Sequence, residues 1–546
     1  MRIRLLLSLS VTITALASCQ GPQEDLTARR IDEIVRFRTE NKDFSGSVLV
    51  AKGDDKVISK AYGLANIEWG VPNTPNTKFR LGSITKQFTA AAILLLEEDG
   101  KLTLGDSVRV HWPEAPRAWD GVTIFHLLTH TSGMPQPDET WRFSEGPAEE
   151  TVGHFRDKPL EFAPGTQYRY SNSGFILLAY LIERISGETY SDFLQKRILT
   201  PLAMSDSGVE SNGPIIENRA SGYAEGDGGF VHAAYISMPS SIGSGALYST
   251  TEDLLRWTRG LFGGKVLKAV SLEKMLTPFK DEYALGIDVA NDNGIRVIRH
   301  GGSIQGFNAM LAYYPDEKMT VVVLANLEGA ADGLVKRLIG FMHGEKVVLP
   351  FEKREIKLPE DALKTLAGIY EVDPDHNVVI TFSNGTLSAR MGSQSPSNLR
   401  AETPNRFFVS DIDGELEFER DSSGAITLVL HQDGATGRAK RLPDRAEVKL
   451  PDEVLRRHAG TYRFAPGVDV VITVENGLLV AKLPHEPNRR SIRSPTRRSS
   501  SRRSMPSWNL FETSPAGLPI WSFAALLRIS RRRASQSRLS EGRRTR

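Results

Sequence analysis

The sequence is short of cysteine, of net charge and of long apolar runs. Its 546 residues include a single cysteine, so no internal disulfide can hold any part of the fold together. The formal net charge is only +2, so the chain as a whole is not a polycation. Beyond the N-terminal segment, no run is long and apolar enough to span a membrane. A chain of this length is expected to form roughly two to four domains, each with its own hydrophobic core.

The N-terminus has the features of a bacterial export signal. Two arginines precede an apolar run from Leu5 to Ala17, which is too short for a spanning helix. The text Leu16-Ala-Ser-Cys19 resembles the bacterial lipoprotein box, in which the cysteine is lipidated. We therefore expect residues 1–18 to be a lipoprotein signal peptide, Cys19 to carry a membrane anchor and residues 19–25 to be a tether. The protein would then be exported to the bacterial cell envelope and face the periplasm. An ordinary signal peptide that ends near a cysteine by chance is the alternative.

One stretch organises the rest of the chain, Leu81-Gly-Ser-Ile-Thr-Lys-Gln-Phe88, which runs into the apolar residues 89–96. It predicts a turn that enters a helix, with Gly100 as the C-terminal stop. Ser83 and Lys86 then share one helix face. An amine beside a serine can take its proton, and the start of a helix favours the negative charge that develops there. Alone, this spacing fits a solvated Ser and Lys on a surface helix equally well.

Two histidines lie four residues apart in the segment 122–134. His126 and His130 could suggest a metal pair, but no third ligand is near and the His-Glu-x-x-His arrangement is absent. We therefore expect no metal ion and no organic cofactor. The histidines are interpreted as structural, either capping a helix or hydrogen-bonded.

Two further polar groups stand beside predicted secondary structure. Tyr170 and Asn172 follow a loop rich in turn formers and precede an amphipathic helix, a junction at which side chains can project into a cleft. His300-Gly-Gly-Ser303 ends a predicted strand that runs into a glycine-rich turn. Taken alone, Tyr170 fits a packed loop aromatic and His300 fits a histidine at a strand end.

The order of predicted elements is strands, then many helices, then strands again. This order predicts an α+β domain over residues 26–345, in which the terminal elements share one antiparallel sheet. The strands are expected at 45–51, 56–62, 295–303, 308–314 and 319–324, and the helices at 26–39, 175–185, 190–198, 251–261 and 333–341.

An internal repeat follows a charged linker at residues 346–360. Ala367-Gly-Ile-Tyr370 recurs 92 positions later as Ala459-Gly-Thr-Tyr462, and two further motifs repeat at the same offset: Val378-Val-Ile-Thr381 as Val470-Val-Ile-Thr473, and Asn384-Gly-Thr-Leu387 as Asn476-Gly-Leu-Leu479. Each copy reads as short alternating strands with Asn-Gly turns, typical of a small β-barrel or sandwich. We assign residues 361–445 and 452–483 to the two copies.

The second copy breaks down near Leu483. Residues 484–546 hold 15 Arg, no Lys and 3 Glu, a net charge of +12, so the preceding chain carries −10. Codons for residues 504–512 read two bases later would permit a sequence that matches Asp413–Asp421 of the first copy at seven of nine positions. We hypothesise a change of reading frame, so that this basic, disordered tail is not an evolved segment. The rival interpretation is a basic tail for membrane lipids or nucleic acid, of which nucleic acid suits an exported protein poorly.

In this order, Ser83-x-x-Lys86, Tyr170-x-Asn172 and His300-Gly-Gly-Ser303 resemble the three motifs of the serine β-lactamase and penicillin-binding-protein family. The Y-x-N form resembles the class C-like branch of β-lactamases, esterases and D-peptidases. Flanking text also resembles that branch, including HLLTHTSG, FAPGTQYRYSNSG and STTEDLLRW. The resemblance covers roughly residues 26–345. It implies a β-lactamase/transpeptidase-like fold, an antiparallel sheet flanked by helices, followed here by the two β-repeats.

The resemblance also implies roles for four catalytic residues. Ser83 would be the nucleophile that forms an acyl-enzyme, and Lys86 would activate it and share its proton. Tyr170, as a phenolate or through a hydrogen bond with Lys86, would be the base for acylation and deliver the proton to the leaving group. Asn172 would orient Lys86 and the substrate amide.

The third motif is expected to bind substrate and complete the oxyanion hole. The backbone N–H groups of Ser83 and Ser303 would form this hole, which is worth roughly 3–4 kcal/mol per donor. Gly301 and Gly302 would let the strand edge approach the substrate. Many family members have Lys-Thr-Gly here, where the lysine helps to bind the carboxylate of β-lactams. Neutral His300 is a weaker carboxylate partner near pH 7, and the His-x-Gly form resembles the D-aminopeptidase and esterase members.

The sequence therefore predicts an exported serine hydrolase that cleaves a small amide or ester. A D-amino-acid peptide or a peptidoglycan fragment would be such a substrate. One alternative is a β-lactamase or D,D-carboxypeptidase. Another is a non-catalytic protein that binds cell-wall fragments. The expected partners are a small molecule or short peptide and, through the lipid anchor, the membrane.

Overall fold

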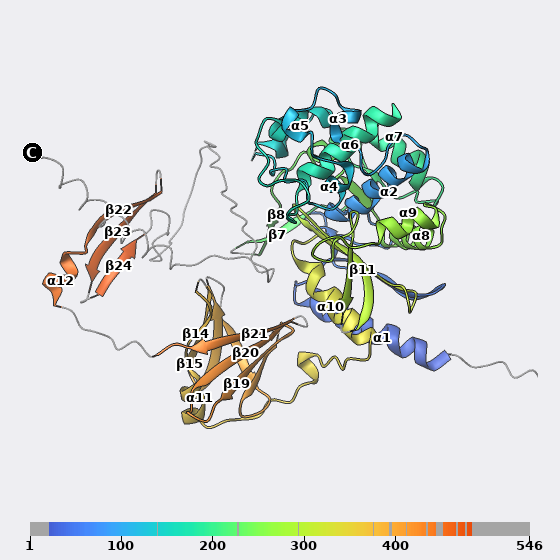
Figure 1. The fold of residues 1–546 in the computed structure, drawn as a ribbon. Coiled ribbons are helices and arrows are strands. Elements are labelled where there is room, and N and C mark those ends of the chain that lie inside the picture. Colours follow the sequence, from blue (N-terminus) through green and yellow to red (C-terminus); the bar gives the residue numbers. More distant parts are fainter. Residues whose placement is uncertain are drawn as a thin grey trace, which may run out of the picture. The chain divides into compact units, whose positions relative to one another are not determined.

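The computed structural model describes residues 21–482, except for 139, 227–228, 293, 375, 393–395, 411, 433–434, 444–450, 466–467 and 476–477. The predicted signal peptide, Cys19 and the basic tail from residue 483 lie outside the described residues. The chain divides into two compact units, Met1–Leu349 and Pro350–Arg546 (Figure 1). Each unit is described by itself.

A six-stranded antiparallel sheet forms the centre of the first unit. Strands from the N-terminal and C-terminal parts of this unit meet where β1 pairs with β13, from Gly46 opposite Ala325 to Lys52 opposite Met319. This confirms that strands from both ends of the domain share one sheet. The strand order is β10 (Asp288–Asp292), β11 (Ile295–Ile304), β12 (Phe307–Tyr314), β13 (Met319–Ala325), β1 (Gly46–Lys52) and β2 (Asp55–Tyr62).

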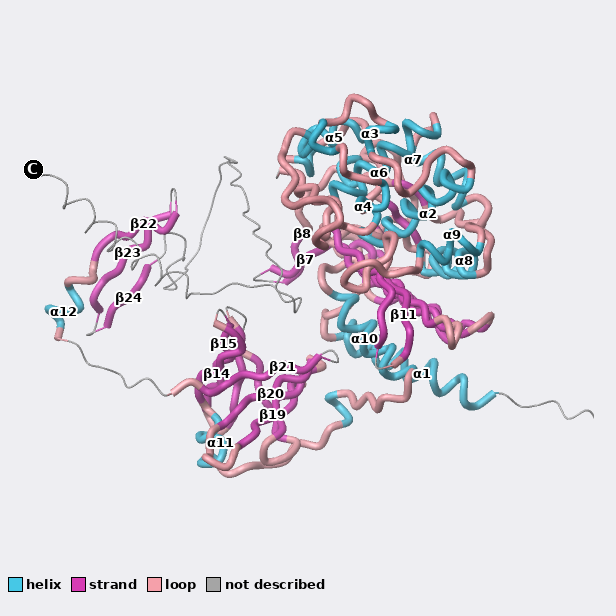
Figure 2. Tube along the Cα trace, viewed as in Figure 1, coloured by secondary structure: helices cyan, strands magenta, loops and turns pink. Residues whose placement is uncertain are grey.

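Both faces of this sheet are buried. In β13, Val321 and Val323 pack into one core and Val322 and Leu324 into the other, because successive side chains of a strand point to opposite faces. Two helices, α1 (Gly21–Glu40) and α10 (Ala330–Met342), cover the first face. The other face carries the larger helical layer (Figure 2). Burial on both sides explains why β13 is apolar at nearly every position.

The helical layer is built around α2 (Thr85–Glu98). Every residue from Thr85 to Leu96 is buried, as expected for a helix that is apolar on all sides. α6 (Asn172–Ser186) packs against it. The other helices of this unit are α3 (Val108–His111), α4 (Ile124–Leu128), α5 (Ala148–Arg156), α7 (Tyr190–Leu194), α8 (Thr251–Phe262) and α9 (Ala269–Met275).

Short strands and tight helical turns connect these elements. The strands are β3 (Leu64–Asn66), β4 (Val71–Pro72), β5 (Phe79–Arg80), β6 (Gly208–Val209), β7 (Tyr223–Gly226), β8 (Gly229–His232) and β9 (Leu247–Ser249). The 3-10 turns are η1 (Gly82–Ile84), η2 (Arg117–Trp119), η3 (Trp141–Phe143) and η5 (Met238–Ser241), and η4 (Gln195–Leu199) is a turn of π-helix. A further 3-10 turn, η6 (Pro350–Glu352), begins the second unit.

Two predictions about local structure are wrong. The segment predicted as a tether is helical from Gly21 onward, so α1 begins five residues before its predicted start at Leu26. The glycine-rich turn expected at the end of the predicted strand 295–303 lies further along the chain. β11 continues to Ile304 and pairs with β12 up to Ile304 opposite Phe307, so the turn falls at Gln305 and Gly306.

The second unit contains a closed barrel of eight antiparallel strands, as predicted in kind for the first repeat. A short helix, α11 (Glu360–Leu366), precedes it, and an apolar core that includes Tyr370, Phe407 and Phe418 fills it. The strands are β14 (Gly368–Asp373), β15 (His376–Ser383), β16 (Thr386–Met391), β17 (Ser397–Ala401), β18 (Arg406–Val409), β19 (Gly414–Arg420), β20 (Ile426–Gln432) and β21 (Ala435–Arg441).

The second copy repeats the start of this barrel with the same strand register. A helix, α12 (Asp452–Arg456), precedes a three-stranded sheet of β22 (Gly460–Ala465), β23 (Val468–Glu475) and β24 (Leu478–Lys482). Gly368 lies opposite Ile380 in the first copy and Gly460 lies opposite Ile472 in the second, and the same bulge follows in both. Tyr370 and Tyr462 also each donate a hydrogen bond to a carbonyl four residues earlier. The repeat is therefore present in the structure as well as in the amino-acid sequence.

The two copies differ in how far they bury equivalent side chains. Tyr370 and Leu387 are 0% and 1% exposed inside the closed barrel. Their equivalents Tyr462 and Leu479 are 51% and 41% exposed. Five of the eight barrel strands have no counterpart among the described residues of the second copy, so its inner face lacks the strands that cover the first. The predicted Asn476-Gly477 turn lies outside the described residues.

Candidate active site

Ser83 lies in the 3-10 turn η1, directly before α2, and is partly exposed. The turn is pressed against β11. A β-carbon on Gly302 would lie 1.9 Å from the carbonyl oxygen of Leu81, and one on Gly82 would lie 2.8 Å from the backbone nitrogen of Ser303. Gly82 also has a φ of +51°, which favours glycine. The glycines therefore allow the nucleophile turn and the strand edge to meet backbone to backbone.

Lys86 lies on the first turn of α2 and is completely buried. Its Nζ is 3.0 Å from Ser83 Oγ, 2.9 Å from Asn172 Oδ1 and 2.9 Å from the carbonyl oxygen of Ser244. It also lies 4.7 Å from the centre of the Tyr170 ring. The structure thus brings together the four residues that the resemblance singled out as catalytic.

Burial lowers the pKa of the Lys86 amine well below its usual value. A neutral amine has two hydrogens and one lone pair. The oxygens of Asn172 and Ser244 can only accept hydrogen bonds, so they take the two N–H groups. The lone pair is then left to accept the hydroxyl proton of Ser83. These contacts make Lys86 suited to be a general base.

Tyr170 keeps its proton in this environment. Burial raises the pKa of the Tyr170 phenol far above its usual value, and the hydrogen bond with the Ser83 side chain opposes that shift only in part. Of the two forms predicted for Tyr170, the geometry therefore favours the neutral phenol beside Ser83 over the phenolate.

Asn172 is the first residue of α6, which explains how a loop motif reaches the buried lysine. The end of a helix fixes the direction of its side chain more firmly than a loop does. Its Oδ1 accepts from Lys86, in agreement with the orienting role implied by the resemblance.

His300 is buried and uncharged. Its Nδ1 is 2.6 Å from the carbonyl oxygen of Gly301, so Nδ1 carries the hydrogen, and Nε2 then accepts from the Tyr283 hydroxyl at 3.1 Å. Burial lowers the pKa of His300 to about 3. The imidazole therefore offers neither a positive charge nor a free N–H to a substrate carboxylate.

Ser303 is exposed at the edge of β11, beside the Ser83 turn. Asn308 on the neighbouring strand holds this edge, because its side chain donates to the carbonyl of Gly302 at 3.2 Å and accepts from the N–H of Ala331 at 2.7 Å. The backbones of Ser83 and Ser303 are therefore close together, as an oxyanion hole requires.

Sequence reasoning missed several residues of this site. The carbonyl of Ser244 gives no signal in a sequence, because any residue can provide it. Tyr283 lies 17 positions from the histidine to which it donates. Gln136 binds the Tyr170 carbonyl and the Asn172 N–H through its amide. His130 was marked by the HLLTHTSG text but was interpreted only as structural.

The two histidines make separate contacts. His126 caps α4 in a reciprocal arrangement with Thr123, while His130 accepts a hydrogen bond from the N–H of Ser171. Within the described residues, no group of three histidine, cysteine or acidic side chains could hold a metal ion. In the same residues, no helix is long and apolar enough to cross a membrane.

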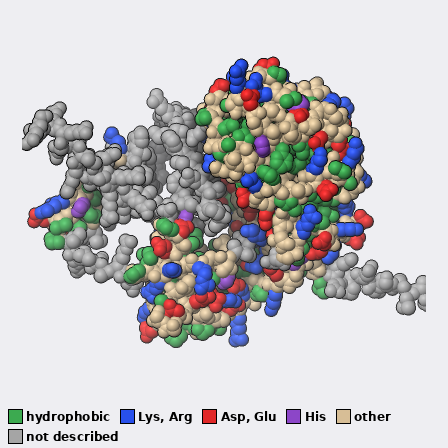
Figure 3. All heavy atoms as spheres, in the orientation of Figure 1, with side chains coloured by type: hydrophobic (Ala, Val, Ile, Leu, Met, Phe, Trp, Pro, Cys, Tyr) green, Lys and Arg blue, Asp and Glu red, His purple; other side chains and the backbone are tan. Residues whose placement is uncertain are grey.

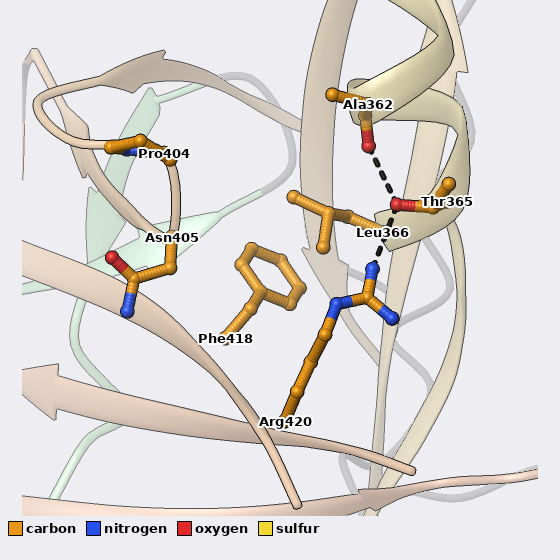
Figure 4. A pocket seen from close by; sticks show the side chains of 7 residues that line it. All are labelled: Ala362, Thr365, Leu366, Pro404, Asn405, Phe418 and Arg420. Atoms are coloured by element: carbon orange, nitrogen blue, oxygen red, sulfur yellow. Dashed lines mark hydrogen bonds between the residues drawn. The ribbon is translucent and has the colours of Figure 1, made fainter. Parts of the chain in front are cut away.

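A separate pocket of about 380 Å³ opens on the barrel, far along the chain from Ser83. Phe418 and Leu366 line it with apolar surface, and the Arg420 guanidinium donates to Thr365 at 2.9 Å (Figure 4). It holds no nucleophile with a base beside it. On the face of the first unit drawn in Figure 3, acidic and basic side chains are interspersed, without a stripe of one sign.

A serine and a buried lysine at the head of a central helix, beside the edge of an antiparallel sheet, define a serine hydrolase. A model of the family described as Beta-lactamase matches residues 31–339, more than half of the chain. The chain therefore belongs to this family, and the predicted fold and enzyme class are confirmed.

Relatives extend this result beyond the catalytic unit. The chain is 28% identical to "Penicillin-binding protein 4*" of Bacillus subtilis over 437 residues, which is 74% of this chain and 96% of the relative. A penicillin-binding protein from Bacillus halodurans has a similar structure (TM-score 0.51, 29% identity, 56% of this chain and 98% of that one). So does an octameric penicillin-binding protein homologue from Pyrococcus abyssi (TM-score 0.54, 25% identity, 76% and 99%).

Proposed function

We propose that this chain hydrolyses a small amide or ester, such as a D-amino-acid peptide or a peptidoglycan fragment, through an acyl-enzyme on Ser83. The contacts of the buried Lys86 amine carry this proposal. Its hydrogens face two acceptors and its lone pair faces the Ser83 hydroxyl. The pair is therefore arranged for proton transfer before any substrate arrives.

The acylation step uses this arrangement. Ser83 Oγ attacks the substrate carbonyl carbon while its proton passes to Lys86 Nζ. The bond from that carbon to the leaving nitrogen or oxygen breaks, and the Tyr170 hydroxyl gives its proton to the leaving group. Lys86 then returns a proton to Tyr170, which leaves both groups neutral. Water hydrolyses the acyl-enzyme by adding its hydroxyl to the acyl carbon and returning a proton to Ser83.

The neutral His300 bears on the substrate class. A substrate with a free carboxylate at this edge would lose its hydration without gaining a positive charge or a hydrogen bond from the imidazole. An uncharged amide or ester avoids this cost. This supports neutral amides and esters over substrates in which a carboxylate must be bound at this position.

We also propose export and a lipid anchor, from the sequence alone. The apolar run Leu5–Ala17 and the text ending in Cys19 support both. Labelling of cells with a radioactive fatty acid tests the anchor. A label that is present in the wild-type protein and absent from the Cys19→Ala variant is the expected result, and equal labelling would refute it.

A matched substrate panel tests the hydrolase proposal. Each substrate would carry one acyl group, a D- or L-amino acid, presented as the amide, the p-nitrophenyl ester and a dipeptide with a free or an amidated C-terminus. We expect turnover of the ester and amides and a loss of at least about tenfold in kcat/KM for the free carboxylate. Equal turnover of the free and amidated dipeptides would contradict the role given to His300.

The names of the relatives favour a second candidate, a protein that penicillin acylates. A chromogenic cephalosporin tests this candidate. Stable acylation of Ser83 at low micromolar cephalosporin would favour it. The first proposal predicts acylation only at much higher concentrations, because β-lactams carry a carboxylate, and rapid turnover would favour a β-lactamase instead.

A further inference from the structure

His130 packs against one side of Tyr170 and contacts none of the reacting atoms. It is 1% exposed and has a φ of +55°, which is unusual for a residue other than glycine. This left-handed backbone turns both its carbonyl group and its ring toward the segment that carries Tyr170. Strain of this kind persists only where surrounding contacts hold it.

Both neighbours of Tyr170 donate to His130. The N–H of Arg169 donates to the His130 carbonyl oxygen at 2.9 Å, and the N–H of Ser171 donates to His130 Nδ1 at 3.1 Å. The His130 ring also lies against the Tyr170 ring, with 4.2 Å between their centres. One residue therefore fixes the backbone before and after Tyr170 and the plane of its phenol.

The rest of the ring is enclosed by aromatic side chains. Phe175 and Tyr283 lie 5.1 Å and 4.6 Å from the His130 ring centre. Because Nδ1 accepts from Ser171, Nε2 carries the hydrogen, and it makes no hydrogen bond within the described residues. A buried N–H without a partner costs free energy. That this cost is tolerated indicates that the position requires a ring with an acceptor at Nδ1.

We infer that His130 is a positioning residue for the Tyr170 hydroxyl, and through it for protonation of the leaving group. The inference rests on the proposed hydrolase function. A hydroxyl displaced by about 1 Å transfers a proton poorly, and such a displacement costs about a hundredfold in rate. Leaving groups that depart as stable anions do not need that proton. Loss of His130 is therefore expected to slow amides far more than activated esters.

The test is the ratio of kcat/KM for an anilide to that for a p-nitrophenyl ester of the same acyl group. This ratio does not depend on how much of a sample is folded. In the full-length protein, we expect His130→Leu to lower it about 30- to 100-fold, and we expect Tyr170→Phe to lower it by a similar factor. His130→Asn retains an acceptor near the Nδ1 position and tolerates a left-handed backbone, so we expect a fall of only about threefold.

His126→Leu is the matched control. His126 also accepts a backbone N–H through Nδ1, but from Thr123, at the start of α4. It is expected to lower stability and to leave the ratio unchanged. An unchanged ratio in His130→Leu, or an equal fall in His126→Leu, would overturn the inference. If the wild-type protein cleaves neither substrate, the proposed function fails instead.

Discussion

At Lys86, burial determines the chemistry. A lysine in water has a pKa of about 10.5, so it keeps its proton and cannot act as a base near neutral pH. Inside this site no described carboxylate pairs with the amine, and the lone pair faces Ser83. His300 is neutral for the same reason, since its position excludes water. The two residues together give the site a base without giving it a positive charge at the strand edge.

The pH dependence of acylation follows from this base. Only neutral Lys86 accepts the Ser83 proton, so kcat/KM is expected to rise with pH through the lowered pKa and then to level off. Lys86→Arg keeps its charge at every accessible pH and should be inactive. Steady-state rates of ester hydrolysis from pH 5 to 10 measure the profile. A rate that falls across this range would contradict neutral Lys86 as the base.

The same shift affects stability. Between the lowered folded pKa and the unfolded value near 10.5, the unfolded chain binds more protons at this lysine than the folded one. The contribution of Lys86 to the free energy of unfolding therefore rises with pH through this window. Urea unfolding at several pH values should show a smaller rise for Lys86→Met than for the wild type, and an equal rise would contradict a neutral lysine.

At the scale of elements, the central feature is the contact between the η1 turn and β11. The two glycines of the His300-Gly-Gly-Ser303 motif differ in the space available for a side chain. A β-carbon on Gly302 would meet the Leu81 carbonyl at 1.9 Å, whereas one on Gly301 would meet only the flexible end of Met310 at 3.2 Å.

Substitution of these glycines tests that contact. Gly302→Ala must push β11 away from the Ser83 turn, so we expect kcat/KM to fall by about a hundredfold. The matched Gly301→Ala variant should stay within about threefold, because Met310 can move. Ester hydrolysis and thermal unfolding of both variants provide the measurement. Equal activity of the two variants would show that close backbone approach is not needed here.

The sequence predicted the elements of the catalytic unit well and their contacts only in part. Alternation located β1, β2, β12 and β13, and helical periodicity located α6 and α8, because both are patterns of neighbouring residues. The glycine-rich turn was expected directly at the end of the strand 295–303, since glycine often marks turns, but Gly302 serves a close approach to the distant Leu81. The Ser244 carbonyl and the two bonds of His130 could not be predicted, because they depend on tertiary contacts.

At the scale of the whole molecule, the two β-repeats show how closure of a barrel changes the burial of side chains on equivalent strands. Their registers agree residue by residue at an offset of 92 positions. Tyr370 and Leu387 are nonetheless buried, whereas their equivalents Tyr462 and Leu479 are exposed. The sequence predicted the repeat and a small β-barrel or sandwich for each copy, but it did not choose between the two or predict the eight strands of the first copy, whose closure depends on the pairing of β14 with β21.

A matched pair of substitutions measures this difference. Tyr370→Ala removes a side chain that is 0% exposed and should cost about 3–5 kcal/mol in the first copy. Tyr462→Ala removes one that is 51% exposed and should cost less than about 1 kcal/mol. Hydrogen exchange of peptides from β14–β16 and from β22–β24 measures the effect on each of the two copies separately. A similar loss of protection in both would contradict the exposed inner face of the second copy.

The interruption itself has a genetic test. The reading-frame hypothesis predicts that the locus in related strains continues the second copy after Leu483 with text like that of Asp413–Asp421. Resequencing of the locus is the measurement. An intact frame with the same arginine-rich tail in several strains would refute the hypothesis.

The central claim is that Ser83 forms an acyl-enzyme. Intact-protein mass spectrometry after rapid quenching with a D-amino-acid p-nitrophenyl ester tests it most directly. We predict one added acyl group, located by peptide mapping to the segment that contains Ser83 and absent from Ser83→Ala. An adduct that persists in Ser83→Ala, or ester hydrolysis that continues at the wild-type rate in that variant, would contradict the claim.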